Sequence, residues 1–532
     1  MENLKHAKTL KHVNRTLHIL LCFFIITSCG FIGSADIPEE VIDVPVITKP
    51  DTTVETDSAG TGAAADTSPA QETNQNTEEE TFHNTYTVTI DVDPVTRNIS
   101  GITKVKYKNK TGAEMSAVYF NLNLNAFRPG VTPKPFFVQS QDKVFENGTD
   151  YGGMDIITAT VNGAAAEFEA IDTTLKLNMP TALLPNEETE IVLQFEAYIP
   201  KISHRAGAND FAIWFGNFLP TLSVYDEFGW HTTSYYPAGD PFYTEIANYA
   251  VTINTPPNYT VAATGVEEVT ETETVKTTKL NARLVRDFAF AISDKYIKTT
   301  VTAASGVEVN LYTYSPDVDT ARILDTASRS LDYFSSLISN YPYRQLDIAE
   351  TGMFISGGME YPQLIFMDSG YLYTDASLET ITHETVHQWF YNIVGNNQVK
   401  EAWLDEGLCA MVQESFKYSN DEIENRMAQE YERLKAVLPD IENKGLLSDL
   451  SVYGTWSDYY NIQYRRGKLM FYSLSKKMGG EKFNDFLKTY YTKYAYKISG
   501  RKEVIATAEE VYGEPLTDFF DGWMQNFELP PL

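Results

Sequence analysis

Two histidines near the middle of the chain have the spacing of metal ligands on a helix. Residues 383–387 read His-Glu-Thr-Val-His, within an apolar pattern that predicts a helix stopped at Gly395. His383 and His387 would lie one turn apart on one face of that helix, so both can bind one metal ion. Glu384 would lie beside them. The alternative interpretation is a surface helix that binds no metal.

A carboxylate further along the chain can complete the ligand set. Eighteen residues separate His387 from Glu406, and residues 400–418 are predicted to form a second helix that folds against the first. Two imidazoles and one carboxylate leave the fourth position of tetrahedral zinc to water, as in catalytic sites. Glu401 and Asp405 compete for the third position, but Asp405 is expected to cap, to pair or to support a ligand. The sequence therefore predicts one Zn²⁺ per chain.

This arrangement predicts the hydrolysis of an amide. Zinc acidifies a water molecule and polarises a carbonyl group. Glu384 can take the proton of that water and deliver it to the leaving amine.

The segment around the two histidines resembles the aminopeptidase family of the gluzincin metalloproteases, called family M1. Residues 383–407 carry the family's zinc helix, its His-Gln-Trp-Phe continuation and its Glu-Gly pair. Residues 357–361 read Gly-Gly-Met-Glu-Tyr, which is similar to the family's Gly-x-Met-Glu-Asn. The resemblance covers residues 84–527 and includes Asp-Phe-Ala-Phe at 287–290. It implies an α+β multidomain fold, with a β-rich, saddle-like domain before a thermolysin-like, mainly helical catalytic domain.

The resemblance also implies roles for individual residues. Glu360 would bind the free α-amine of a peptide, which makes the substrates peptides with a free N-terminus. Tyr464, in a Tyr-Arg-Arg-Gly segment similar to the family's Tyr-x-Lys-Gly, would donate a hydrogen bond to the developing oxyanion. Tyr361 replaces the family's Asn, so the contact with the substrate backbone is expected to differ. The remaining substrate-binding residues implied by the motif are Gly357, Gly358 and Met359.

The elements that must position these residues divide the chain into two folded parts. Tyr86, Val88 and Ile90 alternate with polar residues, and similar alternation with turn-rich breaks continues to about residue 300. Residues 81–300 are therefore predicted to form the β-rich domain. Beyond Ser315 the apolar period becomes helical, with a stripe of Ala321, Leu324, Ala327, Leu331 and Phe334. Residues 301–532 are predicted to form the zinc peptidase domain, with no C-terminal helical domain and a more open cleft.

The first 80 residues are predicted to export and tether the protein. Residues 1–28 combine basic residues with a short apolar run at 19–26, which is typical of a signal peptide and too short to span a membrane. The end of this run resembles a bacterial lipobox, so Cys29 would be lipidated; the alternative is an ordinary signal peptide. Residues 29–80 are predicted to be an acidic, disordered tether. The expected location is extracytoplasmic, on a lipid anchor in a bacterial membrane.

Composition excludes several other classes of protein. The chain has 42 Lys and Arg against 72 Asp and Glu, a formal net charge of −30, which argues against a nucleic-acid partner. Three cysteines exclude a disulfide framework and an all-cysteine metal site. Cys409 is expected to be a buried small hydrophobe, and His204 and His231 are expected to have no metal role.

Together these observations predict a lipid-anchored zinc metallopeptidase that acts as an aminopeptidase. Two alternatives stay open. One is an endopeptidase of the same fold, and the other is a surface binding lipoprotein that kept the fold without catalysis. The oligomeric state stays open as well.

Overall fold

The computed structural model describes residues 82–354, 357–441, 443–525 and 528–532. Residues 82–532 belong to one structural unit. The predicted signal peptide at 1–28, the lipidation site Cys29 and the tether at 29–80 lie outside the described residues. Of the helices that the structure describes, none combines the length and the apolar character that a membrane span requires.

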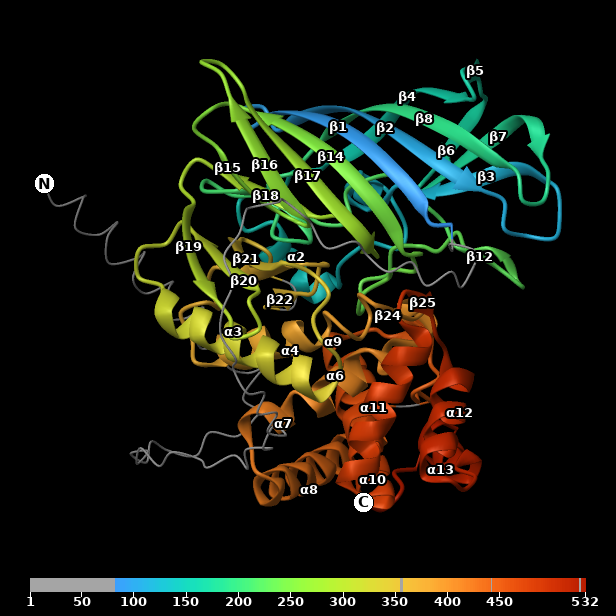
Figure 1. The fold of residues 1–532 in the computed structure, drawn as a ribbon, viewed down its shortest axis with the longest axis vertical. Helices are drawn as coiled ribbons and strands as arrows, with labels where there is room; N and C mark the ends of the chain where they lie inside the picture. The colour runs from blue at the N-terminus through green and yellow to red at the C-terminus, as the bar shows by residue number, and fades with distance from the viewer. Residues whose placement is uncertain (1–81, 355–356, 442, 526–527) are drawn as a thin grey trace, which may run out of the picture. The chain divides into compact units, whose positions relative to one another are not determined.

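The N-terminal half is built from strands, as the alternation predicted (Figure 1). Tyr86, Val88 and Ile90 are buried, whereas Thr87 and Thr89 are exposed. The elements are β1 (Asn84–Asp93), β2 (Asn98–Lys108), β3 (Met115–Asn121), η1 (Asn123–Phe127), η2 (Val138–Ser140), α2 (Gln141–Val144), β4 (Gly153–Val161), β5 (Ala164–Ala165), β6 (Phe168–Ile171), β7 (Thr174–Leu183), β8 (Glu188–Tyr198), β9 (Ala206–Ala208), β10 (Ile213–Phe215), β11 (Thr221–Leu222), β12 (Tyr225–Asp226), β13 (Gly229–Trp230), β14 (Ala247–Thr255), β15 (Thr260–Ala263), β16 (Val266–Glu271), β17 (Lys276–Val285) and β18 (Phe290–Ser293).

One large sheet dominates this half, with the strand order β16-β17-β14-β1-β2-β8-β4-β5 (Figure 1). β1 pairs in parallel with β14, and Tyr86 lies opposite Tyr249 with the two rings stacked 4.7 Å apart. Two smaller sheets, β15-β18-β10-β9 and β11-β3-β7-β6, accompany it. Their inward side chains share one apolar core with those of the large sheet.

The second half combines a mixed sheet with a set of helices. Its sheet has the order β19-β20-β21-β23-β22, and the helices follow β23 except for α3. The elements are β19 (Ile297–Thr302), β20 (Glu308–Thr313), α3 (Thr320–Leu337), β21 (Gln345–Thr351), β22 (Gly358–Met359), β23 (Leu364–Asp368), α4 (Ala376–Val386), β24 (Val394–Gly395), α5 (Gln398–Glu401), η3 (Ala402–Leu404), α6 (Glu406–Val412), α7 (Glu414–Lys417), α8 (Asn420–Val437), η4 (Leu438–Asp440), η5 (Leu450–Val452), α9 (Trp456–Tyr459), the π-helix η6 (Tyr460–Arg466), α10 (Gly467–Met478), α11 (Gly480–Tyr494), β25 (Lys497–Ile498), α12 (Arg501–Tyr512) and α13 (Thr517–Met524).

This succession of a β-rich part and a mainly helical part confirms the predicted α+β multidomain class. The expected division at residues 300/301 falls inside β19, which pairs with β20 of the second sheet. In α3 the predicted apolar stripe lies in the core from Leu324 to Phe334. Ala321, predicted on that stripe, is exposed, and Ile323 is buried instead.

Two helix predictions were wrong. The helix that carries the histidines ends at Val386, and Gly395 belongs to β24 rather than to a helix end. Trp389 and Ile393 are nevertheless fully buried, because a turn places them in the core and no helix is needed. The second helix, predicted as continuous over 400–418, is divided into the short pieces α5, η3, α6 and α7.

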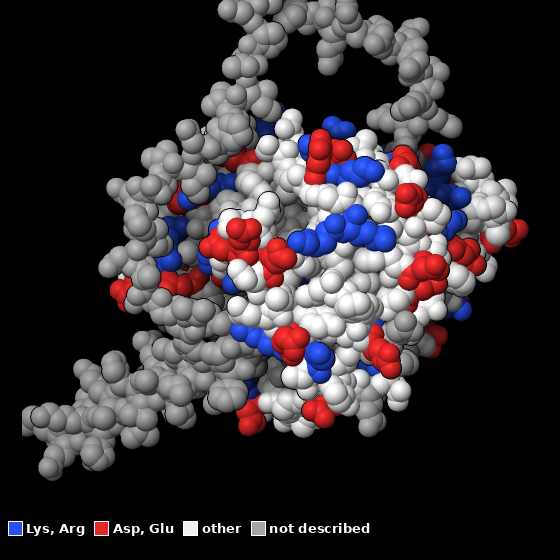
Figure 2. All heavy atoms as spheres, turned by 90° about the horizontal axis from the view of Figure 1, so that it is seen from below, with Lys and Arg blue, Asp and Glu red and all other residues white. Residues whose placement is uncertain are grey.

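The face of the molecule drawn in Figure 2 carries acidic and basic side chains interspersed with uncharged ones. The basic side chains visible there are adjacent to acidic ones in several places, so this face presents charge of both signs.

Candidate active site

The three predicted metal ligands meet at one point. His383 Nε2 and His387 Nε2 lie 3.0 Å apart, and Glu406 Oε2 lies 3.3 Å from the first and 3.4 Å from the second. Three ligand atoms bound at about 2.1 Å around a tetrahedral ion lie about 3.4 Å from one another. Two imidazole nitrogens that face each other and one carboxylate therefore fit a zinc ion in donor type and in spacing.

Each imidazole is fixed by a partner on its other nitrogen. His383 Nδ1 lies 2.8 Å from Gln413 Oε1, and His387 Nδ1 lies 3.2 Å from the main-chain oxygen of Phe390. Both partners are acceptors, so each ring carries its proton on Nδ1 and turns Nε2 toward the shared point. Cys409 is buried as expected, with its Sγ 3.4 Å from His387 Nδ1.

The helix that begins with Glu406 packs closely against α10. A Cβ added to Gly407 would lie 2.8 Å from Gly467 Cα, so only glycines allow α6 and α10 to be this close. Burial would raise the pKa of Glu406, but hydrogen bonds from His383 and His387 hold it below its usual range. Glu406 is therefore ionised, as a metal ligand must be.

Tyr464 faces the same carboxylate from the π-helix that precedes α10. Its hydroxyl donates to Glu406 Oε1 at 2.5 Å, and its ring stacks against His383 with 5.8 Å between the ring centroids. Burial and the Glu406 charge raise the pKa of Tyr464, so its hydroxyl keeps the proton and acts as a donor. π-Helical turns are frequent at functional sites.

Glu384 is buried beside the ligands on α4. Strand β22 lies against this part of the helix, since a Cβ on Gly358 would be 2.6 Å from Glu384 Oε1. Burial, followed by the charge of Glu360, raises the pKa of Glu384 well above its usual value. A carboxylate with a raised pKa is a stronger proton acceptor, which suits a general base.

Glu360 is buried at the end of β22, within a network of amide side chains. Its Oε1 accepts from Gln398 Nε2 at 3.2 Å, and its main-chain oxygen accepts from Asn392 Nδ2 at 2.7 Å. Burial and the Asp240 charge raise the pKa of Glu360 to about 7. Asp405 directly precedes Glu406 in the chain. It accepts from Gln398 at 2.7 Å and from Asn396 at 2.8 Å, so these amide side chains hold it in place.

The other predicted positions lie in β22 or next to it. Gly357 has a φ of +83°, and its oxygen accepts from Asp368 N at 2.9 Å; Met359 is buried opposite Phe366. The Tyr361 hydroxyl donates to Asn217 Oδ1 at 3.0 Å. The structure thus brings the three ligands together with Glu384, Glu360 and Tyr464, and the roles of the predicted residues in binding stay predictions.

The sequence analysis missed the amide side chains of the site. Gln413 follows Glu406 by seven residues, two helical turns, so its position on the same face was readable from the sequence. Asn396 lies in a loop and Gln398 in the short helix α5, where no periodicity marks them. His204 binds the Pro135 oxygen at 2.9 Å and His231 pairs with Asp226 at 2.7 Å, so both have ordinary partners.

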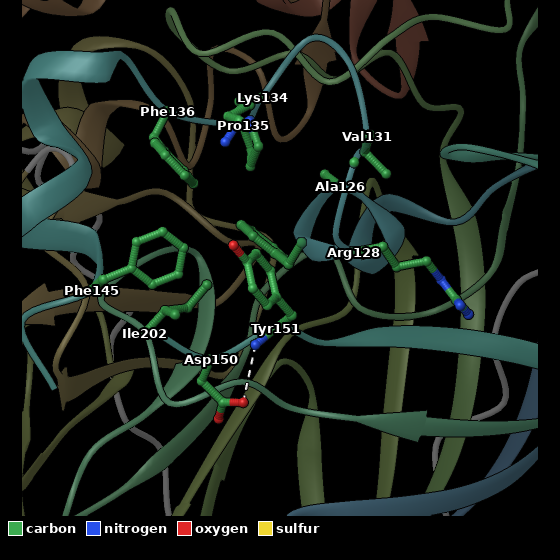
Figure 3. Close-up of a pocket in the computed structure, with 12 residues that line it drawn as sticks. Ala126, Arg128, Val131, Lys134, Pro135, Phe136, Phe145, Asp150, Tyr151 and Ile202 are labelled. Atoms are coloured by element: carbon green, nitrogen blue, oxygen red, sulfur yellow. Dashed lines mark hydrogen bonds between the residues drawn. The ribbon is translucent and has the colours of Figure 1, made fainter. Parts of the chain in front are cut away.

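A separate pocket lies in the N-terminal half, lined mainly by residues 126–136 and 145–151 (Figure 3). Two of its charged side chains have charged partners, because Arg128 pairs with Asp155 at 2.7 Å and Asp150 pairs with Arg97 at 3.0 Å, and Lys134 lies over the Phe136 ring. Asp150 also accepts from the Tyr151 main-chain nitrogen, as the dashed line in Figure 3 marks. None of the metal-site residues lines this pocket.

The fold and the donor set define a β-rich domain joined to an α/β domain with an HExxH metal helix. Residues 322–523 match the sequence description of the Peptidase family M1 domain. The match confirms the resemblance seen in the motifs.

Curated relatives carry names from the same family. Aminopeptidase M1-B of Oryza sativa subsp. japonica is 26% identical over 260 residues, which cover 43% of this chain and 28% of that relative. Glutamyl aminopeptidase of Sus scrofa is 25% identical over 313 residues, with coverages of 54% and 33%. The matched region thus spans about a third or less of the length of these relatives.

Solved structures match over more of the chain. The M1 zinc metallopeptidase from Deinococcus radiodurans superimposes with a TM-score of 0.63 at 16% identity, covering 85% of this chain and 95% of that one. A variant of that protein bound to a Tyr-Ser-Ala substrate gives a TM-score of 0.59 with the same coverage. This likeness establishes the two-domain fold.

Proposed function

We propose that this chain is a zinc-dependent metallopeptidase that removes N-terminal residues from peptides. The observation that carries the proposal is the convergence of His383, His387 and Glu406 at tetrahedral spacing, with Glu384 buried beside them. A bound zinc would supply Lewis acidity there, by acidifying water and polarising the substrate carbonyl.

The side chains of the chain carry the proton transfers. Glu384 accepts a proton from the attacking water and holds it until the C–N bond begins to break. It then donates the proton to the leaving amine. Tyr464 exchanges its present acceptor, Glu406, for the carbonyl oxygen as negative charge develops on it.

Glu360 would restrict the reaction to free N-termini. A buried carboxylate that already accepts one amide N–H is a favourable partner for the α-ammonium group of a peptide. The names of the curated relatives, and the Tyr-Ser-Ala substrate in a related structure, support peptides as substrates and aminopeptidase action.

The substitution Glu384→Gln tests the catalytic assignment. We expect the variant to keep one zinc per chain, measured by elemental analysis, and to lose about 10²–10⁴-fold in turnover because the general base is gone. Glu379→Gln is the matched control. It lies on the same helix and pairs with Lys417 near the surface, so it should keep wild-type turnover. Substantial residual activity of Glu384→Gln would contradict the mechanism.

We further propose that the protein is exported and anchored by lipid at Cys29. The basic residues, the short apolar run and the lipobox-like end of residues 1–29 support this proposal. In a bacterial host, the wild type should incorporate labelled fatty acid and sediment with membranes. Cys29→Ser should do neither; a lipid label retained on Cys29→Ser would contradict the proposal.

A further inference from the structure

One amide side chain connects Glu360 to the segment that carries the third metal ligand. Gln398 Nε2 lies 3.2 Å from Glu360 Oε1 and 2.7 Å from Asp405 Oδ2. Because both neighbours are carboxylate oxygens, the orientation of the amide is settled, and both N–H groups are used. Gln398 Oε1 has no hydrogen-bond partner among the residues that the structure describes.

Asp405 is itself held in place. Asn396 Nδ2 donates to its Oδ1 at 2.8 Å, while Gln398 occupies its Oδ2. Asn396, Asp405, Gln398 and Glu360 are all buried, so their hydrogen bonds form without competition from bulk water. Asp405 also precedes Glu406 directly. The network therefore ties the carboxylate of Glu360 to the backbone position that presents the metal ligand.

The same residues could be read as a second metal site. Glu360, His387 and Asp405 each offer a ligand atom, and these atoms lie within 4.8 Å of one another. The hydrogen bonds argue against this interpretation, because both oxygens of Asp405 already accept amide N–H groups. Glu360 offers its Oε2, while Oε1 faces Gln398. One available carboxylate oxygen suits an ammonium group better than a metal ion that needs several ligands.

We propose that Gln398, held by Asp405, is the positioning residue that orients Glu360 toward the α-ammonium group of the substrate. This inference rests on the proposed function. The Gln398 N–H fixes one carboxylate oxygen and stabilises the charged form, which leaves the other oxygen aimed at the incoming amine. Gln398 thus determines specificity for free N-termini without touching the reacting carbonyl.

A pair of inhibitors isolates this effect from catalysis. Phenylalanine hydroxamate carries an α-amine, and 3-phenylpropionohydroxamic acid lacks only that amine, so the ratio of their inhibition constants reports amine recognition. The zinc-loaded full chain should prefer the amine by at least about tenfold. Gln398→Met keeps the side-chain volume and removes both N–H groups. It should reduce the preference about tenfold, with binding of the des-amino compound and the zinc content unchanged.

A double-mutant cycle tests whether Gln398 acts through Glu360. Glu360→Gln should abolish the preference for the amine, and adding Gln398→Met should then cause no further loss. Gln345→Met is the matched control, because Gln345 is also buried and donates to a carboxylate, Asp347, at 3.3 Å. The control should leave the ratio unchanged.

The outcomes separate this inference from the proposed function. If the wild type shows no preference for the amine, the proposed role of Glu360 fails and the inference fails with it. If the wild type prefers the amine but Gln398→Met keeps the full ratio, only the inference fails. An equal loss of affinity for both inhibitors would overturn it too, since that would show a purely structural role. Two zinc ions per wild-type chain would favour the binuclear interpretation and overturn it.

Discussion

At the scale of the residue, Tyr464 is the side chain that we propose donates a hydrogen bond to the developing oxyanion. Its hydroxyl keeps its proton because burial and the Glu406 charge raise its pKa. We expect Tyr464→Phe to lower kcat by about 10²-fold or more, with a smaller change in KM and an unchanged zinc content. Tyr472→Phe, on the following helix α10, should behave like the wild type. Equal effects of the two substitutions on kcat would contradict the role of Tyr464.

Asp347 gives the fold a pH dependence that is independent of the metal. It is buried in β21, where Asn310 donates to its Oδ1 at 2.8 Å, and burial raises its pKa to about 7. Between about pH 4 and 7 the folded state therefore binds a proton that the unfolded state has released. The free energy of unfolding of the wild type should fall relative to that of Asp347→Asn as the pH rises through this window.

Chemical denaturation of both proteins across that window measures the effect. Zinc is lost equally from both at low pH, so their difference isolates Asp347. A difference that stays constant with pH would contradict the raised pKa.

The grouping of the candidate metal ligands was predictable from sequence. The spacing of His383 and His387 on one helical turn and the downstream Glu406 predicted a ligand set that the structure brings together. Asp405 was predicted to support a ligand, and the structure gives it two amide partners. Gln398 was not predicted, because an amide in a four-residue helix follows no periodic pattern and acquires its partners only from the tertiary fold.

At the scale of the element, the distance between α6 and α10 positions Glu406 and Tyr464. Gly407 and Gly467 are in direct backbone contact there. Gly407→Ala should separate the helices, destabilise the protein by about 1–3 kcal/mol and lower turnover. Gly480→Ala, where an added Cβ meets nothing within 4 Å, should leave both unchanged or raise stability slightly. Thermal unfolding and kcat measure the two effects, and a neutral Gly407→Ala would contradict the close-packing argument.

Helix boundaries were the least predictable elements. Apolar spacing continues past Val386 through Trp389 and Ile393, so the pattern alone favours a longer helix. The chain turns instead, with Tyr391 at a φ of +86°, and the same residues are buried in the turn. Similarly, the helix predicted over 400–418 is broken near Asp405, whose carboxylate accepts from Asn396 and Gln398. The apolar periodicity of the sequence does not show this break.

At the scale of the whole molecule, Arg286 joins the β-rich half to the loop after the metal helix. It is fully buried and donates to the main-chain oxygens of Tyr391, Thr244, Ile393 and Lys497 at 2.6–3.3 Å. All the hydrogen bonds described for it are to main-chain carbonyl groups. Removing it would leave several buried oxygens without donors.

We therefore expect Arg286→Met to lower the free energy of unfolding by about 3 kcal/mol or more. Arg283→Met, three residues earlier on the exposed face of β17, should change it by less than about 0.5 kcal/mol. Denaturant titration of the zinc-loaded proteins measures both. If the Arg286→Met variant were as stable as the Arg283→Met control, the result would contradict the role of Arg286 in joining the two halves.

The β-rich and helical halves were predictable as classes because the apolar period changes from two to 3.6 along the chain. The contacts between the two halves were not predictable, because Arg286 is a single charged residue beside Asp287 and follows no periodic pattern. Its carbonyl partners lie up to 211 residues away.

Comparing the hydrolysis of one peptide with a free N-terminus and the same peptide N-acetylated tests the central claim most directly. With the zinc-loaded full chain, we expect cleavage of the free peptide alone, because the role proposed for Glu360 is to bind an α-ammonium group. Comparable cleavage of both peptides would contradict the claim and indicate an endopeptidase. Cleavage of neither peptide by a chain that holds zinc would contradict it in favour of a binding protein.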